Sequence, residues 1–257
     1  MITQRINRVI AAFLLMSITG MTACITLEDW MKTVVPRPSG KKVVVMLVDV
    51  SYSTKTLWKL YLENFYKAVD ELGPGDSLVV SIINHDPLGT AERMTYRFEE
   101  CDSFSTNPLL CKKKLVAQKE QAKKDGSEFF DHVTPSTESR IFDSTLIAAK
   151  IFSAHPPDTS RSLVLMSDMI ENGDAFNFER SAPLSDAQVK KVIARLKGEK
   201  RLPNLQGVKV SVVAPMPAEG NRSSRRYLGL QRFWKEFFSS SGADLGERYG
   251  PTFDGIQ

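Results

Sequence analysis

Apolar residues along the chain follow two patterns, one typical of buried strands and one typical of helices. Continuous apolar runs predict strands that are buried on both faces, as in the middle of a parallel sheet. Such strands are expected at 42–49, 76–84, 161–167 and 208–214. Residues 93–99 alternate instead, which predicts an antiparallel edge strand with one wet face. Helical spacing predicts helices at 57–72, 112–124, 140–154, 184–197 and 226–240, with a loop at 126–138.

Strands that alternate with helices imply a mostly parallel sheet with helices on both faces. We therefore expect an α/β fold that is doubly wound, with five to six strands and one antiparallel edge strand. In such sheets, ligands bind beyond the carboxyl ends of the strands. Two of the predicted strands end in Asp, at Asp49 and Asp168. Both carboxylates are therefore expected on the same rim of the sheet.

The first 23 residues have the pattern of a secretory signal. Arg5 and Arg8 precede an apolar run at 9–16, which is shorter than the roughly 20 residues of a membrane-spanning helix. The sequence Met21-Thr22-Ala23-Cys24 resembles a bacterial lipobox, which implies lipid attachment to Cys24 and removal of residues 1–23. An ordinary signal peptide cut nearby, or an uncleaved anchor, is the alternative.

The rest of the chain divides into three parts. Residues 24–41 are expected to hold the lipidated cysteine and a tether with Pro and Gly, which spaces the domain from the membrane. The domain is placed at 42–242, and residues 243–257 are placed in a loose C-terminal tail. Anchoring at Cys24 would leave the protein facing the periplasm. Ile25 stands where inner-membrane lipoproteins often carry Asp, which favours the outer membrane.

Composition and charge are those of an ordinary globular domain. Of 257 residues, 42% are hydrophobic and 25% are charged. The formal net charge of +4 falls to about +2 when Arg5 and Arg8 are removed, which is no nucleic-acid footprint. Export leaves Cys101 and Cys111 as a pair in an oxidising compartment. We expect a disulfide between them, at the end of the sheet opposite Asp49, with two free thiols as the alternative.

The segment Asp49-Val50-Ser51-Tyr52-Ser53 carries the most informative chemistry. In the turn after a strand, residues two apart can point the same way, so one carboxylate and two hydroxyls converge. Oxygen ligands at this spacing suit Mg²⁺, which prefers octahedral oxygen coordination and keeps several waters. One carboxylate would leave the ion undercharged, and Asp168 can supply the second.

This motif resembles the metal-ion-dependent adhesion site of von Willebrand factor A domains, and the resemblance covers about residues 42–242. The family has a Thr just before a later helix, and Ser139 matches it, with Thr137 as the alternative. The family's Asp after the following strand is matched by Asp168. The Gly that usually follows that Asp is Met169 here, which puts the conformation of the loop in doubt.

The resemblance implies which residues hold the ion. Ser51, Ser53 and Ser139 would contact Mg²⁺ directly, with Mn²⁺ or Ca²⁺ as other candidate ions, and Asp49 and Asp168 would act through water or at longer range. One coordination position then stays open, which in the family is filled by an Asp or Glu of a partner. The resemblance thus implies a membrane-anchored, cation-dependent protein-binding module whose partner is an envelope protein presenting Asp or Glu.

Two other classes of function stay open. One is a metal-dependent hydrolase of the envelope, and the other is a metal-free scaffold with the same fold. The sequence has no His-Glu-x-x-His motif, Walker loop or Gly-x-Ser-x-Gly elbow, so we expect binding and no enzyme activity. His85 and Asp86 are expected on the same rim, as exposed turn residues rather than as a second metal site.

Overall fold

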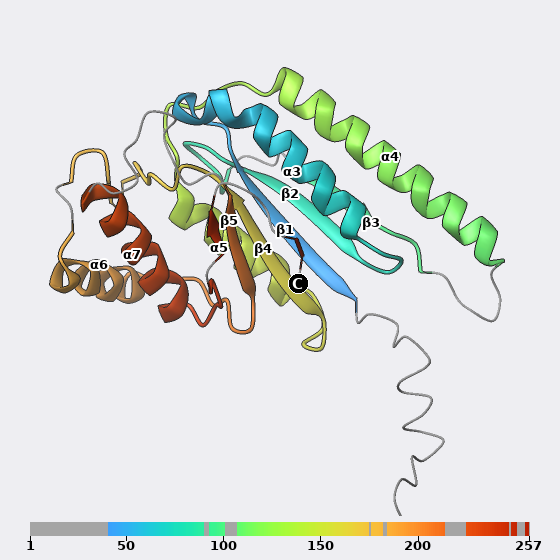
Figure 1. The fold of residues 1–257 in the computed structure, drawn as a ribbon. Helices are drawn as coiled ribbons and strands as arrows, with labels where there is room; N and C mark the ends of the chain where they lie inside the picture. The colour runs from blue at the N-terminus through green and yellow to red at the C-terminus, as the bar shows by residue number, and fades with distance from the viewer. Residues whose placement is uncertain are drawn as a thin grey trace, which may run out of the picture. The chain divides into compact units, whose positions relative to one another are not determined.

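A six-stranded sheet organises the part of the chain that the computed structural model describes. The described residues are 41–89, 93–100, 107–174, 176–181, 184–213, 225–246, 248–250 and 255–256. The strand order is β3-β2-β1-β4-β5-β6, and each pairing is parallel except the antiparallel β2–β3 pairing (Figure 1). The strands are β1 Lys42–Asp49, β2 Ser77–Ile83, β3 Arg93–Arg97, β4 Ser160–Met166, β5 Lys209–Val213 and β6 Tyr249–Gly250.

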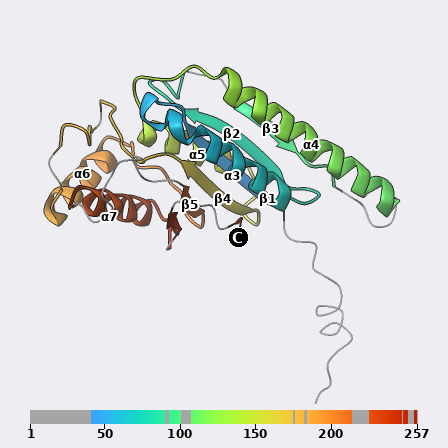
Figure 2. The same cartoon turned by 45° about the horizontal axis from the view of Figure 1, so that its top comes forward.

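Helices cover both faces of this sheet, as Figures 1 and 2 show. They are the 3-10 helix η2 Tyr52–Leu57, α3 Trp58–Glu71, α4 Pro108–His132, α5 Ile141–Ser153, α6 Asp186–Gly198 and α7 Arg225–Ser240. In β1, Val44 and Met46 join the core under α3 and α4, and Val45 and Leu47 join the core under α5, α6 and α7. Because β1 is buried on both faces, its sequence has no polar alternation. The doubly wound α/β class and its antiparallel edge strand are confirmed.

The helix α4 is longer than the sequence predicted. The prediction ended the helix at 124 and began a loop at Gly126, whereas α4 continues to His132. Gly126 is buried inside the helix, and a Cβ atom there would lie 2.3 Å from Cε1 of Phe65 in α3. The glycine therefore serves the close approach of two helices, and it does not end one.

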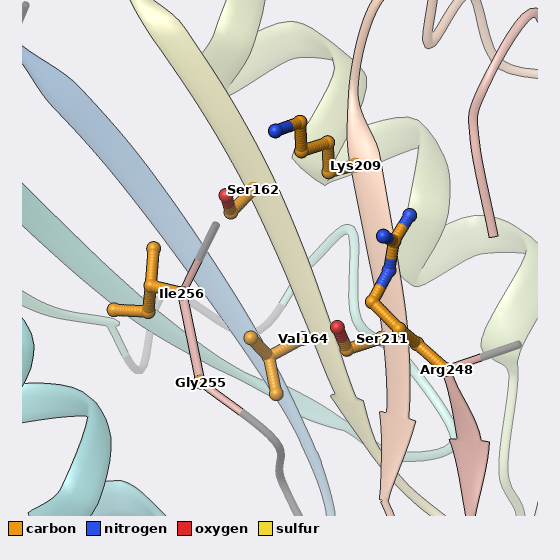
Figure 3. Close-up of a pocket in the computed structure, with 7 residues that line it drawn as sticks. All are labelled: Ser162, Val164, Lys209, Ser211, Arg248, Gly255 and Ile256. Carbon is orange, nitrogen blue, oxygen red and sulfur yellow. The ribbon is translucent and has the colours of Figure 1, made fainter. Parts of the chain in front are cut away.

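The C-terminal residues also differ from the loose tail that was expected. Tyr249–Gly250 form β6 and pair with Val212 and Val213 of β5, which extends the sheet. Further on, Gly255 and Ile256 lie over the face of the sheet that holds Ser162 and Val164 (Figure 3). The cavity between them measures about 10 Å³, which is room for about one water molecule. Residues this few carry no readable periodicity, so only the packing places them.

Several predictions about the N-terminal region and the cysteines fall outside the described residues. The signal sequence, Cys24, most of the tether and Cys101 belong to this group. Cys111 is buried in the first turn of α4, and its pairing with Cys101 stays a prediction. No helix within the described ranges is long and apolar enough to span a bilayer.

The contact between Gly126 and Phe65 leads to a stability prediction. Gly126→Ala should lower the free energy of unfolding by about 1–2 kcal/mol, because overpacking outweighs the gain in helix propensity. Urea denaturation measures the change. Gly198→Ala is the matched control, since an added Cβ at this position in α6 meets no atom within 4 Å. Equal effects of the two substitutions would contradict the packing role of Gly126.

Candidate metal centre

The predicted site lies where the order of the strands reverses. The chain runs from β1 to β2 and β3 on one side, then returns to β4 on the other side of β1. The loops after β1 and β4 therefore diverge, and they leave a crevice beyond the carboxyl ends of the two strands. Asp49 is the last residue of β1, and Asp168 follows the end of β4 by two residues. The topology thus brings these two carboxylates to one crevice.

Asp49 is fully buried and accepts hydrogen bonds on both carboxylate oxygens. Its Oδ1 accepts from the backbone N–H of Ser51 at 2.9 Å and from Oγ of Ser139 at 3.0 Å. Its Oδ2 accepts from Oγ of Ser167 at 2.6 Å. Three chain segments, one after β1, one before α5 and one after β4, therefore meet at a single carboxylate.

A chain of oxygen atoms connects this carboxylate to Asp168. The Oγ atoms of Ser51 and Ser53 lie 3.1 Å apart, and Ser53 donates from Oγ to Oδ2 of Asp168 at 2.8 Å. The other oxygen of Asp168, Oδ1, accepts from the backbone N–H of Ile170 at 3.0 Å. Ser53 is exposed at the rim, whereas Ser51 and Asp168 are buried. The structure thus brings together all five residues that the sequence singled out.

The loop before α5 is positioned by a backbone contact with the turn after β1. Ser136 donates from its N–H to the carbonyl of Val50 at 2.8 Å, and its own carbonyl accepts from the N–H of Tyr52 at 3.0 Å. This pairing leaves Thr137 exposed and Ser139 buried at 2% exposure, with its hydroxyl on Asp49. Of the two alternatives from the sequence, Ser139 is therefore the residue at the site.

Residues that the sequence reasoning missed hold this loop in place. The segment after Asp168 grips the start of α5, because Oδ1 of Asn172 accepts from the N–H of Ser139 at 2.5 Å. Oε2 of Glu171 accepts from the N–H of Phe142 at 2.9 Å, which places a carboxylate at the N-terminus of α5. Its Oε1 accepts from the N–H of Gly173 at 3.0 Å. Their only sequence signal was their position after a strand that ends at the rim.

Ser167 and Thr54 also escaped the sequence reasoning. Ser167 bonds to Asp49 and accepts from the N–H of Met169 at 2.9 Å, so it connects the ends of β1 and β4. Thr54 donates from Oγ1 to the carbonyl of Asp49 at 2.8 Å and lies 3.4 Å from Oγ of Ser51. Both hydroxyls are fully buried and shape the turn around Asp49.

Met169 occupies a backbone conformation that favours glycine. Its φ is +63°, in the left-handed region, which costs a non-glycine residue roughly 1–2 kcal/mol. The Met169 side chain is fully buried in the core under α5, α6 and α7, and its carbonyl accepts from Nε1 of Trp234 at 2.8 Å. Core packing thus holds the loop in this conformation without the glycine.

The electrostatics of the site are set by burial. Burial raises the pKa of Asp168 to about 7, and the neighbouring Asp49 carboxylate raises it as well. Burial also raises the pKa of Asp49, against hydrogen bonds from Ser167, Ser51 and Ser139 that lower it. Among the described residues, no Lys, Arg or His forms an ion pair with either carboxylate. Two buried acids therefore stand close together without a cationic side chain.

His85 and Asp86 lie on the same rim and are exposed. The N–H of His85 donates to Oγ of Ser136 at 3.1 Å, and that of Asp86 donates to Oδ1 of Asn84 at 3.0 Å. Within the described ranges, no group of three or more His, Cys, Asp or Glu side chains could hold a metal. The candidate centre is of another kind, since two carboxylates and three hydroxyls compose it.

Comparisons with known proteins identify similar folds. No protein-family model matches the sequence, and no curated protein matches it. The pilus adhesin SpaC from Lactobacillus rhamnosus GG is similar, with a TM-score of 0.50 and 9% identity, over 84% of this chain and 29% of that one. The manganese-loaded TRAP protein of Plasmodium vivax has a TM-score of 0.41 and 14% identity, over 78% of this chain and 63% of that one. A von Willebrand factor type A structure from Catenulispora acidiphila has a TM-score of 0.36 and 15% identity, over 79% of this chain and 43% of that one.

These likenesses concern the fold. The chain spans less than two thirds of the length of each of the three structures. The likeness to SpaC agrees with the strand order of a mixed, mostly parallel sheet covered on both faces. The architecture is accordingly the doubly wound α/β type that Rossmann-like and von Willebrand factor A domains share.

Glu171 leads to a prediction for the metal-free protein. Burial raises its pKa from an ordinary value of 4.5 to about 8, so in this pH window the folded state keeps a proton that the unfolded state has lost. The free energy of unfolding should therefore fall as pH rises through the window, by up to about 1.4 kcal/mol per pH unit.

Glu171→Gln should flatten this dependence, because Gln cannot ionise. Urea denaturation across the window measures the slope, and Glu128→Gln, at an exposed position in α4, is the matched control. Identical slopes for wild type and Glu171→Gln would show that Glu171 ionises normally in the folded state.

Proposed function

We propose that this chain is a divalent-cation-dependent protein-binding module of the von Willebrand factor A type. The observation that carries the proposal is the convergence of Asp49, Ser51, Ser53, Ser139 and Asp168 at the switch point of the sheet. Three chain segments supply these residues, and the contacts between them are printed in the backbone as well as in the side chains. Such convergence builds a site on rigid elements.

The donor set fits a hard divalent cation. All five side chains offer oxygen, which Mg²⁺ and Mn²⁺ prefer, and Ca²⁺ accepts the same ligands. Two buried carboxylates without a cationic partner gain most from a bound ion, because the ion offsets the cost of burying their charge. When bound, the ion would supply a positive charge that is only partly neutralised. Ser51, Ser53 and Ser139 would hold it, and Asp49 and Asp168 would orient these hydroxyls and balance its charge.

The surroundings of the site suit a protein partner. Ser53 opens to the surface, and Tyr52 beside it is 62% exposed. Leu88, in the turn after β2, is 61% exposed and is the other large apolar side chain exposed in the loops of this rim, within the described residues. A partner's Asp or Glu would complete the coordination, and apolar side chains around it would pack on Tyr52 and Leu88. We propose that the module is non-catalytic.

Export and anchoring are part of the proposal. The signal pattern at 1–23 supports secretion, and the lipobox-like sequence supports lipid attachment at Cys24. The protein would then face the periplasm from a bacterial membrane, with the outer membrane favoured by Ile25. Its partner would be another envelope protein. A disulfide between Cys101 and Cys111 fits the same compartment.

One observation favours a metal-free scaffold as the second candidate. The hydroxyls of Ser139 and Ser167 already bond to Asp49, and that of Ser53 bonds to Asp168, so the site is internally hydrogen-bonded. A scaffold of this kind would need no ion to fold. Ion binding to the folded state separates the two candidates, because it must raise apparent stability by mass action.

Mg²⁺ or Mn²⁺ should raise the free energy of unfolding. At a free concentration of about 100 times the Kd, the expected gain is about 2.7 kcal/mol. Asp49→Ala and Asp168→Ala should remove the gain, and both variants should fold without metal because each loses a buried charge. Thermal denaturation measures the effect. Asp86→Ala, at an exposed position on the same rim, should keep the full gain. An equal gain in Asp49→Ala would mean that the ion binds elsewhere.

Capture from solubilised envelope membranes tests the partner. Wild-type protein with Mg²⁺ should retain a protein that EDTA releases and that Asp49→Ala does not retain. Calorimetry with the purified partner should then show a loss of affinity of roughly 30-fold or more when its contacting Asp or Glu is made Asn or Gln. An affinity that is the same with Mg²⁺ and with EDTA would rule out coordination through the ion.

A further inference from the structure

The first turns of α4 extend beyond the sheet, at the end opposite the candidate metal centre. Gln118 marks where the overhang begins, because its Nε2 donates to the carbonyl of Arg97 and its Oε1 accepts from the N–H of Glu99. Arg97 pairs with Ser77, the first residue of β2, so Gln118 is level with the end of the sheet. Residues 108–117 precede it and reach about 15 Å further at 1.5 Å per residue. Figures 1 and 2 both show α4 projecting past β2 and β3.

This overhang is unusually apolar on its outer surface. Leu109 is 63% exposed, and Leu110 and Val116 are each 51% exposed. They account for half of the large apolar side chains that are exposed within the described residues, and they fall within two turns or so of one helix. Pro108 starts the helix and Asn107 caps it, with Oδ1 accepting from the N–H of Leu109 at 2.9 Å. The apolar tip is therefore part of a formed helix.

Lysines stand beside these apolar side chains. Lys112 and Lys113 are exposed, and neither forms an ion pair with a described residue. Lys114 pairs with Glu99 at 3.1 Å. The next acid, Glu100, pairs with Lys41. The acids that follow β3 are thus already matched, and the overhang keeps two unmatched positive charges.

Further cations line the same end of the sheet on its other face. Arg97 and Lys150 are exposed there and border a groove of about 310 Å³ that His155 also lines. The described chain begins here as well, since the carbonyl of Lys41 accepts from the N–H of Ser160, the first residue of β4, at 3.0 Å. Residues 1–40 therefore join the domain at the end that carries these charges.

Exposed leucines alternating with lysines fit an anionic bilayer surface better than a protein. The centre of a protein interface is depleted in Lys and enriched in aromatic residues, and the overhang has lysines and no aromatic side chain. At a membrane surface, leucines enter the boundary between headgroups and acyl chains, and lysines bind the phosphates of anionic lipids. Both requirements are met within residues 109–116.

We propose that the overhanging first turns of α4 dock on an anionic phospholipid surface. Leu109 and Leu110 enter the interface, and Lys112 and Lys113 bind the headgroup phosphates. The sheet then holds the metal centre at its far end, turned away from the bilayer and toward a partner. The docking needs neither the metal ion nor a lipid on Cys24. An attached lipid would place the same end of the domain at the membrane.

Sedimentation with phospholipid vesicles tests the docking. Residues 41–257 form one compact unit with both cores, so this fragment is used without signal or lipid. It should sediment with vesicles of phosphatidylglycerol and phosphatidylethanolamine, and not with vesicles of phosphatidylcholine alone. Leu109→Ser with Leu110→Ser should weaken binding about tenfold or more. Lys112→Gln with Lys113→Gln should weaken it by a similar factor, and added salt should do the same.

Matched substitutions elsewhere give the controls. Leu228→Ser removes an exposed leucine from α7, and Lys190→Gln with Lys191→Gln removes two exposed lysines from α6; each should leave vesicle binding unchanged. EDTA and Asp49→Ala should also leave it unchanged, which separates this docking from the metal site. Absence of binding to anionic vesicles would overturn the proposal, and so would equal losses in the controls. Self-association that Leu109→Ser and Leu110→Ser abolish, without vesicle binding, would overturn it and assign the surface to a second copy.

Discussion

Two carboxylates are buried where β1 and β4 part, and the cost of that burial constrains everything around them. Asp49 and Asp168 are 0% and 1% exposed, and no described basic side chain pairs with either. Burial alone would favour their neutral forms, as the raised pKa values indicate. Hydroxyls and backbone N–H groups from three segments offset part of this cost. A divalent cation would offset the rest, which is the physical ground for a metal centre at this point.

The arrangement depends on loops that hold one another. Ser136 joins the loop before α5 to the turn after β1, and Asn172 joins it to the loop after β4. Glu171 anchors the start of α5 in the same way. Because each loop begins at a buried strand or ends at a packed helix, the oxygen atoms are held by the fold and need no ion to assemble them. A preformed site of this kind loses little conformational entropy on binding.

The two ends of the sheet differ in chemistry. One end gathers acids and hydroxyls at a crevice, with Tyr52 exposed beside them. The other end carries unmatched lysines and exposed leucines on the overhang of α4. A parallel sheet separates its two ends by the length of its strands, so one end can face a surface while the other receives a partner. The opposed charges follow from this geometry, since neither group neutralises the other.

The sequence by itself determined the class of fold and the candidate ligands, because both depend on local patterns. The unbroken apolar run of β1 shows burial on both faces, and a strand that ends in Asp shows which rim carries charge. Tertiary structure alone decided the rest. The length of α4 depends on whether Gly126 meets another helix, and β6 exists only because β5 offers it an edge. Ser167 and Asn172 act on residues far away in the chain, and no local pattern encodes contacts made across separate loops.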